Sequence, residues 1–230
     1  MMAERARWWG GLAFAAALAL SWWVAARPAP LPGDVRLTHW VQSQEWFASA
    51  ADAVNPLGSP AHWPILGAVT GAVIIVARAR RLPVIPPCTA LAAAAMLRPL
   101  SQALKRLVES PRPDASFGVS VDHVRASYGF PSGHVFADVL LYGAMAWAIS
   151  SVAGRRAARA AWATATLIVV LAGPARVYVG AHWPSDVVGG YLWGTAALAL
   201  AVVAGDLTRR WTRPAPGTPR DAHGRSAPGG

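Results

Sequence analysis

Long apolar segments constrain this chain more than any other feature of its sequence. A helix needs about 20 apolar residues to cross the hydrocarbon of a bilayer. Six stretches of roughly that length follow one another, at approximately Trp8–Ala26, Ala61–Ala77, Val84–Leu104, Val135–Val152, Ala161–Val179 and Val187–Ala204. Hydrophobic residues make up 54% of the chain and charged residues 14%, which disfavours a water-soluble globule. The sequence therefore predicts an all-α, integral membrane bundle of six transmembrane helices.

Clusters of arginine lie beside these segments, at alternate ends of successive predicted helices. The four clusters are Arg5 and Arg7; Arg78, Arg80 and Arg81; Arg155, Arg156 and Arg159; and Arg209, Arg210 and Arg213. Because cytoplasmic loops carry an excess of Lys and Arg, all four clusters can face the cytoplasm. This predicts a multi-pass protein of the cell membrane with both termini in the cytoplasm. The connections Arg27–Pro60, Lys105–Pro131 and Gly180–Asp186 then lie on the extracytoplasmic side.

The formal net charge of +10 would suggest a nucleic-acid partner in a soluble protein. Here many arginines flank apolar segments, where they set the topology and attract anionic lipid headgroups. We therefore expect membrane lipids, and not nucleic acid, as partners. The single cysteine, Cys88, has no metal-ligand spacing around it, and the sequence contains no glycine-rich nucleotide signature and no metal-binding pair of histidines. We expect no metal and no other cofactor.

The domain organisation follows from the same pattern. Residues 1–206 are predicted to form one membrane domain with a motif-bearing core at about 98–190, and residues 207–230 a disordered, basic cytoplasmic tail. From Trp211 onward the chain is rich in Pro, Gly and Arg and lacks apolar periodicity. The first apolar segment could instead be a secretory signal, although its flanking tryptophans favour a retained helix. The connection Arg27–Pro60 could form a short interfacial helix or a plain loop.

Side chains suited to chemistry gather in two of the three extracytoplasmic connections. Three groups follow one another: Lys105 with Arg112 and Pro113; Pro131, Ser132, Gly133 and His134; and Arg176 with His182 and Asp186. Phosphoryl transfer without a metal needs fixed cations around the phosphate oxygens, amide donors, an in-line nucleophile and an acid for the leaving oxygen. The three groups together supply each of these parts.

Five residues form the predicted phosphate-binding set. The planar guanidinium groups of Arg112 and Arg176 suit phosphate oxygens, and Lys105 offers a mobile point charge at the end of the third segment. Ser132 and Gly133 directly precede the fourth segment, so their amides can point at an anion that the helix dipole also favours.

Two histidines complete the predicted chemistry. His182 is the better nucleophile, because Asp186 can accept the proton of one ring nitrogen and leave the other free to attack phosphorus. His134 lies at the first turn of the fourth segment, where an imidazolium could protonate the departing alkoxide. Water would then attack the phosphohistidine, with His134 acting as the base. Taken singly, these residues have structural alternatives: Ser132 or Asp186 could cap a helix, and Lys105 could anchor at headgroups.

These motifs resemble the type 2 phosphatidic acid phosphatase superfamily, whose fold is shared with vanadium-dependent haloperoxidases and bacterial acid phosphatases. The resemblance covers roughly Leu104–Gly190. It implies roles for six residues: phosphate binding for Lys105, Arg112 and Arg176, protonation of the leaving group for His134, and nucleophilic attack for His182 oriented by Asp186. The same roles follow from the residues themselves.

One residue departs from this family pattern, and one further charged residue lies in an apolar segment outside the motifs. Ala175 stands where the family usually has serine before the arginine of its third motif, which we expect to cost a hydrogen bond and leave the nucleophile in place. Arg98 lies within the third apolar segment, where a charge is costly and usually faces the protein interior. It shares a helical face with Lys105, and we hypothesise that it pairs with Asp138, one turn beyond His134. Alternatively, Arg98 snorkels or meets a cytoplasmic water pocket.

The predicted activity is metal-independent hydrolysis of a lipid phosphomonoester or diphosphate at the extracytoplasmic membrane face. Polyprenyl diphosphate, phosphatidate and phosphatidylglycerophosphate are candidate substrates, since an amphiphile can diffuse laterally into such a site. One alternative is a phosphotransferase that uses the same intermediate. Another is a catalytically silent lipid-binding or scaffold protein, or a channel. The intact His182, His134 and Asp186 argue against silence, and a transporter would place its polar groups near mid-membrane.

Overall fold

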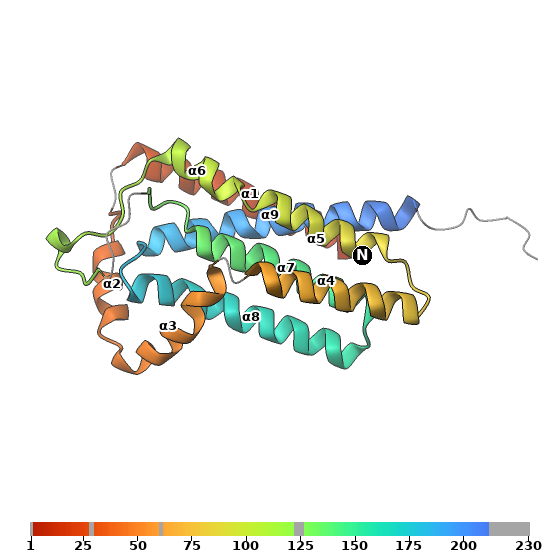
Figure 1. The fold of residues 1–230 in the computed structure, drawn as a ribbon. Coiled ribbons are helices and arrows are strands. Elements are labelled where there is room, and N and C mark those ends of the chain that lie inside the picture. Colours follow the sequence, from red (N-terminus) through yellow and green to blue (C-terminus); the bar gives the residue numbers. More distant parts are fainter. Residues whose placement is uncertain (1, 28–29, 60–61, 122–126, 212–230) are drawn as a thin grey trace, which may run out of the picture.

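The computed structural model describes residues 2–27, 30–59, 62–121 and 127–211, and all regular structure within these ranges is helical. The elements in chain order are α1 (Met2–Ala26), α2 (Asp34–Gln42), η1 (Glu45–Phe47), α3 (Ala48–Val54), η2 (Asn55–Gly58), α4 (His62–Ala79), α5 (Ile85–Leu97), α6 (Leu100–Val108), η3 (Ala115–Phe117), α7 (Gly133–Val152), α8 (Arg155–Tyr178) and α9 (Pro184–Trp211). The long helices run side by side in an elongated bundle (Figure 1). The predicted all-α fold is confirmed.

Six membrane spans are not confirmed among the described residues. Among the described residues, four helices are long and apolar enough to cross a membrane: α1, α7, α8 and α9. A fifth span results if the bent pair Glu45–Gly58 and Trp63–Ala79, which meet at 69°, is counted as one. The predicted third segment divides at Arg98 and Pro99 into α5, with 13 residues, and α6, with 9. Proline inside a helix removes a hydrogen bond and clashes with the preceding turn, which explains the division.

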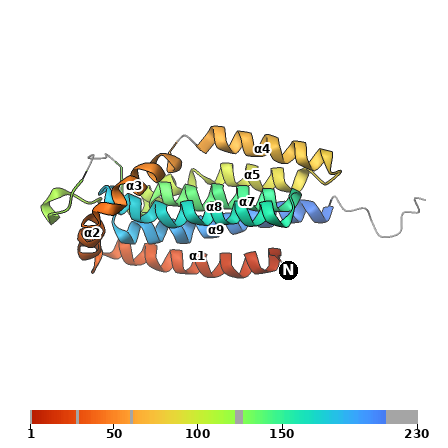
Figure 2. The same ribbon diagram turned by 90° about the horizontal axis from the view of Figure 1, so that it is seen from below.

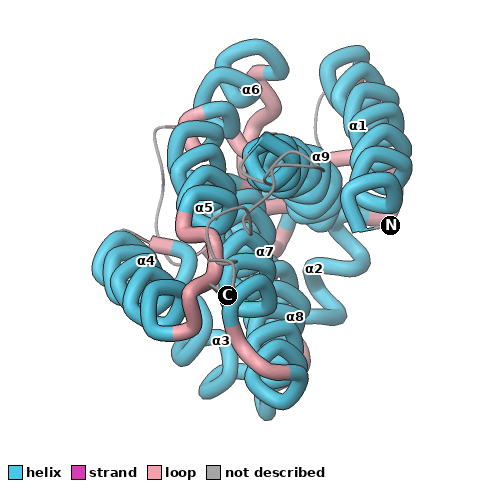
Figure 3. Tube along the Cα trace, turned by 90° about the vertical axis from the view of Figure 1, so that its right-hand side faces the viewer, coloured by secondary structure: helices cyan, strands magenta, loops and turns pink. Residues whose placement is uncertain are grey.

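Helix α7 lies at the centre of the bundle. Its sequence is apolar on all sides, and a helix of that kind is stable where other helices surround it. It packs against α4, α5, α8 and α9, whereas α1 lies outside and packs mainly on α9 (Figures 2 and 3). Of the apolar window of α7, 83% is buried inside the protein, against 17% for α1. The apolar outer surface of α1 is therefore suited to face lipid.

Glycines let α9 approach α7 closely. A Cβ at Gly190 would come within 2.9 Å of the Ser132 carbonyl oxygen, and a Cβ at Gly194 within 3.0 Å of the Phe136 carbonyl oxygen. Small residues are typical of such crossings between membrane helices, because they let two backbones meet. The first turns of α7 and α9 are thus held side by side, and motifs far apart in the sequence meet at one end of the bundle.

The connection predicted as either an interfacial helix or a loop is largely helical where the structure describes it. α2, η1, α3 and η2 fold across one end of the bundle (Figure 1), with α2 against α8 and α9, and α3 against α8. Phe47 and Ala51 bury their side chains against Ala175 of α8. These short helices therefore cover the end of the bundle at which the motifs meet.

The boundary of the predicted tail needs a correction. Helix α9 continues to Trp211, so residues 207–211 are helical. Within this stretch Nε of Arg210 lies 3.5 Å from Oδ2 of Asp206, one turn back, and an ion pair at this spacing supports a helix. The rest of the predicted tail, residues 212–230, lies outside the described residues.

Candidate active site

The three predicted motif groups meet at one end of the bundle. The last turns of α6 and α8, the first turn of α7 and the segment before α9 enclose a cavity of about 200 Å³. Six predicted residues line it: Lys105, Arg112, Gly133, His134, Arg176 and His182. Ser132 and Asp186 lie behind the lining and are fully buried.

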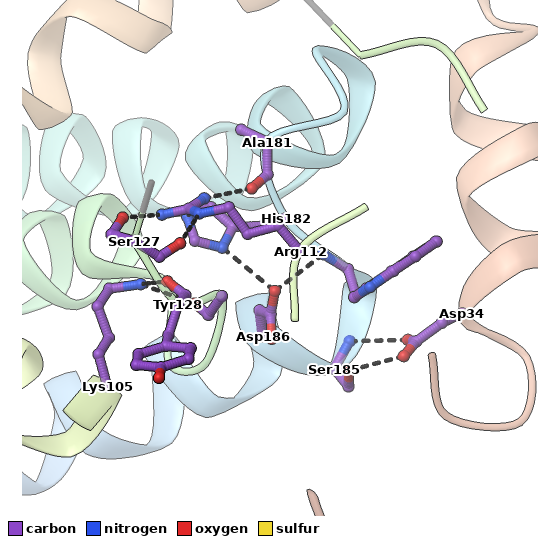
Figure 4. Close-up of polar contacts among 11 residues, drawn as sticks. Asp34, Lys105, Arg112, Ser127, Tyr128, Ala181, His182, Ser185 and Asp186 are labelled. Atoms are coloured by element: carbon purple, nitrogen blue, oxygen red, sulfur yellow. Dashed lines mark hydrogen bonds and ion pairs between the residues drawn. The ribbon is translucent and has the colours of Figure 1, made fainter. Parts of the chain in front are cut away.

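A buried hydrogen-bond network holds the ring of His182. Its Nδ1 lies 3.2 Å from Oδ2 of Asp186, and both side chains are almost completely buried (Figure 4). The same Oδ2 accepts the amide of Trp183 at 3.1 Å, at the point where α9 begins. Pro184 is the first residue of α9, a position that suits proline because its ring presets the helical φ. Asp186 therefore caps the helix and orients the histidine at the same time.

The other ring nitrogen of His182 faces the cations. Nε2 lies 3.2 Å from a terminal nitrogen of Arg112. The pKa of His182 is lowered well below its ordinary value of 6.5 by burial and then by the charges of Lys105, Arg112, Arg176 and His134. A neutral imidazole with its proton on Nδ1, toward Asp186, keeps the lone pair on Nε2. That is the protonation state a nucleophile needs.

Lys105, predicted as a mobile point charge, is held in place. Its side chain is buried, and Nζ donates to the carbonyl oxygens of Tyr128 and Gly129 at 2.6 and 2.8 Å (Figure 4). It belongs to the last turn of α6, where the helix dipole favours a cation. The prediction that Lys105 is mobile was therefore wrong. Its ammonium group is fixed in the cavity wall and orders the loop that precedes α7.

Arg112 joins two loops around the cavity. Its Nε and one terminal nitrogen donate to the carbonyl oxygen and the hydroxyl of Ser127, at 2.6 and 3.0 Å. Its other terminal nitrogen donates to the carbonyl oxygen of Ala181 (Figure 4). The guanidinium group therefore ties the segment before α7 to the segment that carries His182. A phosphate oxygen entering beside Nε2 would meet a donor already in place.

Arg176 fixes the backbone of the same segment from α8. It is buried in the last turn of that helix and donates to Oδ1 of Asn55 at 2.8 Å. Its carbonyl oxygen accepts the amides of Ala181 and His182, at 3.0 and 3.2 Å. The chain reverses at Gly180, whose φ of +62° suits glycine. Asn55 was not predicted, because no local pattern in its segment marks it as a partner of α8.

The start of α7 differs in one respect from the prediction. The amide of Ser132 donates to the carbonyl oxygen of Asp186 at 2.9 Å, so it is not directed at an anion in the cavity. This bond joins the starts of α7 and α9. Gly133 is the first residue of α7, where backbone amides lack partners within the helix, and it lines the cavity. His134 follows it, half-buried on the same wall.

Asp34 of α2 is a buried carboxylate that the sequence did not mark. Its Oδ1 accepts the amide of Ser185 at 2.9 Å, and its Oδ2 accepts the Ser185 hydroxyl at 2.7 Å (Figure 4). The same Oδ2 also accepts the amide of Leu31 at 2.9 Å. Ser185 lies in the first turn of α9, immediately before Asp186. A carboxylate is favourable at a helix N-terminus, so Asp34 anchors this turn. Gly33 immediately before Asp34 indicates the start of α2, but nothing in the local sequence indicates that Asp34 binds Ser185 in α9.

Arg98 also lines the cavity. Its guanidinium carbon lies 5.8 Å from the centre of the Trp63 ring, within the range of a cation–π contact. Asp138, its hypothesised partner, is buried in α7 and interacts electrostatically with both Arg98 and Arg176. Arg98 and Asp138 are thus close enough to interact electrostatically, while a direct ion pair between them stays a prediction.

Comparison with known proteins places this arrangement in a family. The model of the PAP2 superfamily matches residues 83–210, which is more than half of the chain. The chain belongs to the PAP2 superfamily. Phosphatidylglycerophosphatase B of Bacillus subtilis (strain 168) is 33% identical to it over 99 residues, 42% of this chain and 47% of that protein. The match thus spans about half the length of this curated relative.

The PAP2 fold also appears in a solved structure. The crystal structure of the first transmembrane PAP2 type phosphatidylglycerolphosphate phosphatase from Bacillus subtilis superposes with a TM-score of 0.73. The superposition covers 89% of this chain and 97% of that chain, at 20% sequence identity. At this identity the likeness shows the fold alone, whereas the match to the family model confirms the resemblance that the motifs indicated.

The PAP2 match contains every predicted site residue but excludes Asp34 and Asn55, which lie before residue 83. The structure also gives a physical reason for Ala175, the departure from the family pattern. Its side chain is fully buried in an apolar cluster with Phe47 and Ala51. A serine hydroxyl at this position would lie among apolar side chains, where an unbonded polar group is costly. Alanine is therefore compatible with the cover that α3 forms here.

Proposed function

We propose that this PAP2 protein is a membrane lipid phosphatase that hydrolyses a phosphomonoester or diphosphate through a phosphohistidine intermediate. The observation that carries the proposal is the pair of contacts made by His182. Nδ1 lies 3.2 Å from the Asp186 carboxylate, and Nε2 lies 3.2 Å from the Arg112 guanidinium at the cavity. One nitrogen is oriented by a carboxylate, and the other opens on a group of cations. This arrangement suits nucleophilic attack on a bound phosphate.

In the first step, the lone pair on Nε2 of His182 attacks phosphorus and the bond from phosphorus to the leaving oxygen breaks. Arg112, Arg176 and Lys105 hold the phosphate oxygens and offset the charge that develops on them. His134, which lines the same cavity at the start of α7, donates a proton to the leaving oxygen. The products are a lipid alcohol, or a lipid phosphate from a diphosphate, and a phosphohistidine.

In the second step, water attacks the phosphohistidine. His134, now neutral, takes a proton from the attacking water, and the bond between phosphorus and Nε2 breaks. Inorganic phosphate leaves, and His182 returns to its neutral state with its Nδ1 proton toward Asp186. All the groups needed for both steps belong to this chain.

The position of the cavity supports an extracytoplasmic site. It lies at the ends of α6 and α8 and the starts of α7 and α9. The arginine clusters lie at the other end of the bundle: Arg78 at the end of α4, Arg155 at the start of α8, and Arg209 near the end of α9. If these clusters face the cytoplasm, the cavity opens on the outer side. In this arrangement residues up to Trp211 form the membrane domain and residues 212–230 a cytoplasmic tail.

A lipid substrate fits this placement, since its phosphate can reach the cavity while its chains stay beside the apolar helices. The candidates are polyprenyl diphosphate, phosphatidate and phosphatidylglycerophosphate. The relatives described above are named for the last of these.

The test is release of inorganic phosphate from these lipids by the purified full-length chain in detergent, with a metal chelator present. We expect turnover that resists the chelator and that His182→Ala abolishes. His39→Ala is the matched control, because His39 is exposed on α2 and does not line the cavity. Equal turnover by the wild type and His182→Ala would refute the nucleophile. A phosphorylated acceptor formed in place of inorganic phosphate would indicate the phosphotransferase alternative.

A further inference from the structure

A polar stripe extends the cavity away from the predicted catalytic residues. Arg98, Ser101, Gln102 and Lys105 all line it: the last three share one face of α6, and Arg98 directly follows α5, just before Pro99. A Cβ on Gly133 would lie 3.6 to 3.8 Å from the side chains of the last three. These side chains therefore converge on the first turn of α7, and Arg98 continues the stripe toward the middle of the bundle.

Arg98 has donor capacity that the described part of the protein does not use. Its Nε is buried and has no hydrogen-bond partner among the described residues. The Trp63 ring lies against one face of the guanidinium, and Asp138 acts on it electrostatically from α7. These neighbours hold the cation at the cavity wall. A buried guanidinium nitrogen without a partner carries a large desolvation cost, which a bound anion would relieve.

The cavity is larger than one phosphate group needs. At about 30 Å³ for each water molecule, its 200 Å³ has room for roughly six or seven waters. Arg98 and Pro99 keep right-handed helical φ and ψ at the junction of α5 and α6, so the seven residues from Arg98 to Lys105 correspond to a rise of roughly 10 Å. Two phosphates that share a bridging oxygen are too close together to use both ends of such a stripe, whereas a short carbon spacer separates them further.

We infer that Arg98, with Ser101 and Gln102, forms a second anion subsite for a phosphate joined to the reacting phosphate by a short carbon spacer such as glycerol. This inference rests on the proposed function and narrows its substrate class to lipids with a terminal phosphomonoester and an internal phosphodiester. In such a lipid the diester lies nearer the hydrocarbon than the monoester does. In the same way, Arg98 lies nearer the middle of the bundle than Lys105 does, so it is placed to meet the diester.

Binding of two soluble headgroup probes, glycerol 1-phosphate and glycerol 1,3-bisphosphate, tests the subsite directly. Isothermal titration with the full chain in detergent, carrying His182→Ala to prevent turnover, gives the ratio of the two affinities. We expect the bisphosphate to bind about tenfold more tightly or better, as one added charge-assisted contact provides. Arg98→Gln should remove this preference, and Arg98→Lys should keep most of it. Arg106→Gln is the matched control, since Arg106 is exposed on α6 outside the cavity.

Equal affinity for the two probes before any change at residue 98 would overturn the subsite, and this outcome does not depend on whether an Arg98 variant folds. A preference that survives Arg98→Gln would overturn the role of Arg98. Lipid turnover by the unmodified chain is measured separately. Turnover without the bisphosphate preference refutes the subsite alone, whereas the preference without turnover of any lipid refutes the phosphatase proposal alone.

Discussion

The Asp34 carboxylate is the most informative residue to perturb outside the motifs. It is 5% exposed and accepts three hydrogen bonds, from the amide of Ser185 at 2.9 Å, the hydroxyl of Ser185 at 2.7 Å and the amide of Leu31 at 2.9 Å. Asp34→Ala leaves the buried amide of Leu31 and the half-buried amide of Ser185 without an acceptor. We expect both the stability of the protein and the position of His182 to depend on these bonds.

The size of the effect follows from the bonds that are lost. A hydrogen bond to a charged group contributes about 1.5–3 kcal/mol, and loss of a helix cap costs about 0.5–2 kcal/mol, with incomplete additivity. For Asp34→Ala we expect a loss of about 3 kcal/mol in the free energy of unfolding, which lowers Tm by roughly 6–12 °C in a chain of this size. Asp34→Asn keeps an acceptor oxygen and should cost about 1 kcal/mol.

Thermal unfolding in detergent measures the stability, and phosphate release measures the consequence for His182. Asp52→Ala is the matched control, because Asp52 is exposed on α3. Ser185→Ala removes one of the three bonds, so the double variant with Asp34→Ala should lose less than the sum of the single losses. At a temperature where Asp34→Ala remains folded, we expect a lower kcat, since the turn before Asp186 is no longer anchored. A Tm and a kcat equal to those of Asp52→Ala would refute the reasoning.

Three further predictions concern the site. Asp186→Asn should lower kcat by roughly 10³- to 10⁴-fold through loss of the Nδ1 tautomer, with Asp52→Asn unchanged in the same phosphate-release assay. Below pH 6.5 His182 is protonated in the unfolded chain but stays neutral in the folded protein, because folding lowers its pKa, so stability is lost as the pH falls. The Tm measured from pH 7 to pH 5 should therefore fall more for the wild type than for His182→Gln. Parallel Tm curves for the two proteins would contradict this. Gly180→Ala combines a φ of +62° with a Cβ only 2.0 Å from a backbone oxygen, and should cost at least about 1–2 kcal/mol of unfolding free energy in denaturation. Gly154→Ala is the control for the capping and entropy effects of the same change: its Cβ lies in open space at an ordinary φ, so it should cost less than Gly180→Ala.

Hydropathy located the helices but not the break in one of them. The apolar segments predicted near α1, α4, α7, α8 and α9 are helical at those places. A long run of apolar residues is a property of the local sequence, so hydropathy detects it without knowledge of the fold. The third segment is equally apolar through Leu97, yet Pro99 ends α5 and starts α6. Apolar composition alone does not indicate such a break. The break is caused by one proline, which has no backbone N–H to donate within the helix.

Motif spacing predicted six of the residues that line the cavity, but not how they are held. The contact between His182 and Asp186 was predictable because both lie within one turn of the same segment. The fixed position of Lys105 was not, since its acceptors are carbonyl oxygens more than twenty residues away. A backbone oxygen carries no side-chain signal, so no sequence pattern marks it as a partner.

The sequence by itself therefore determined the helical membrane class, the order of the three motif groups and several of the residues that line the cavity. These follow from short-range rules: apolar length, helical periodicity and the chemistry of side chains within a turn or two. Tertiary structure decided the bonds from Asp34 to Ser185 and from Arg176 to Asn55, and it placed Arg98 on the cavity wall. Each of these depends on the positions of helices far apart in the chain, which packing sets and local sequence does not encode.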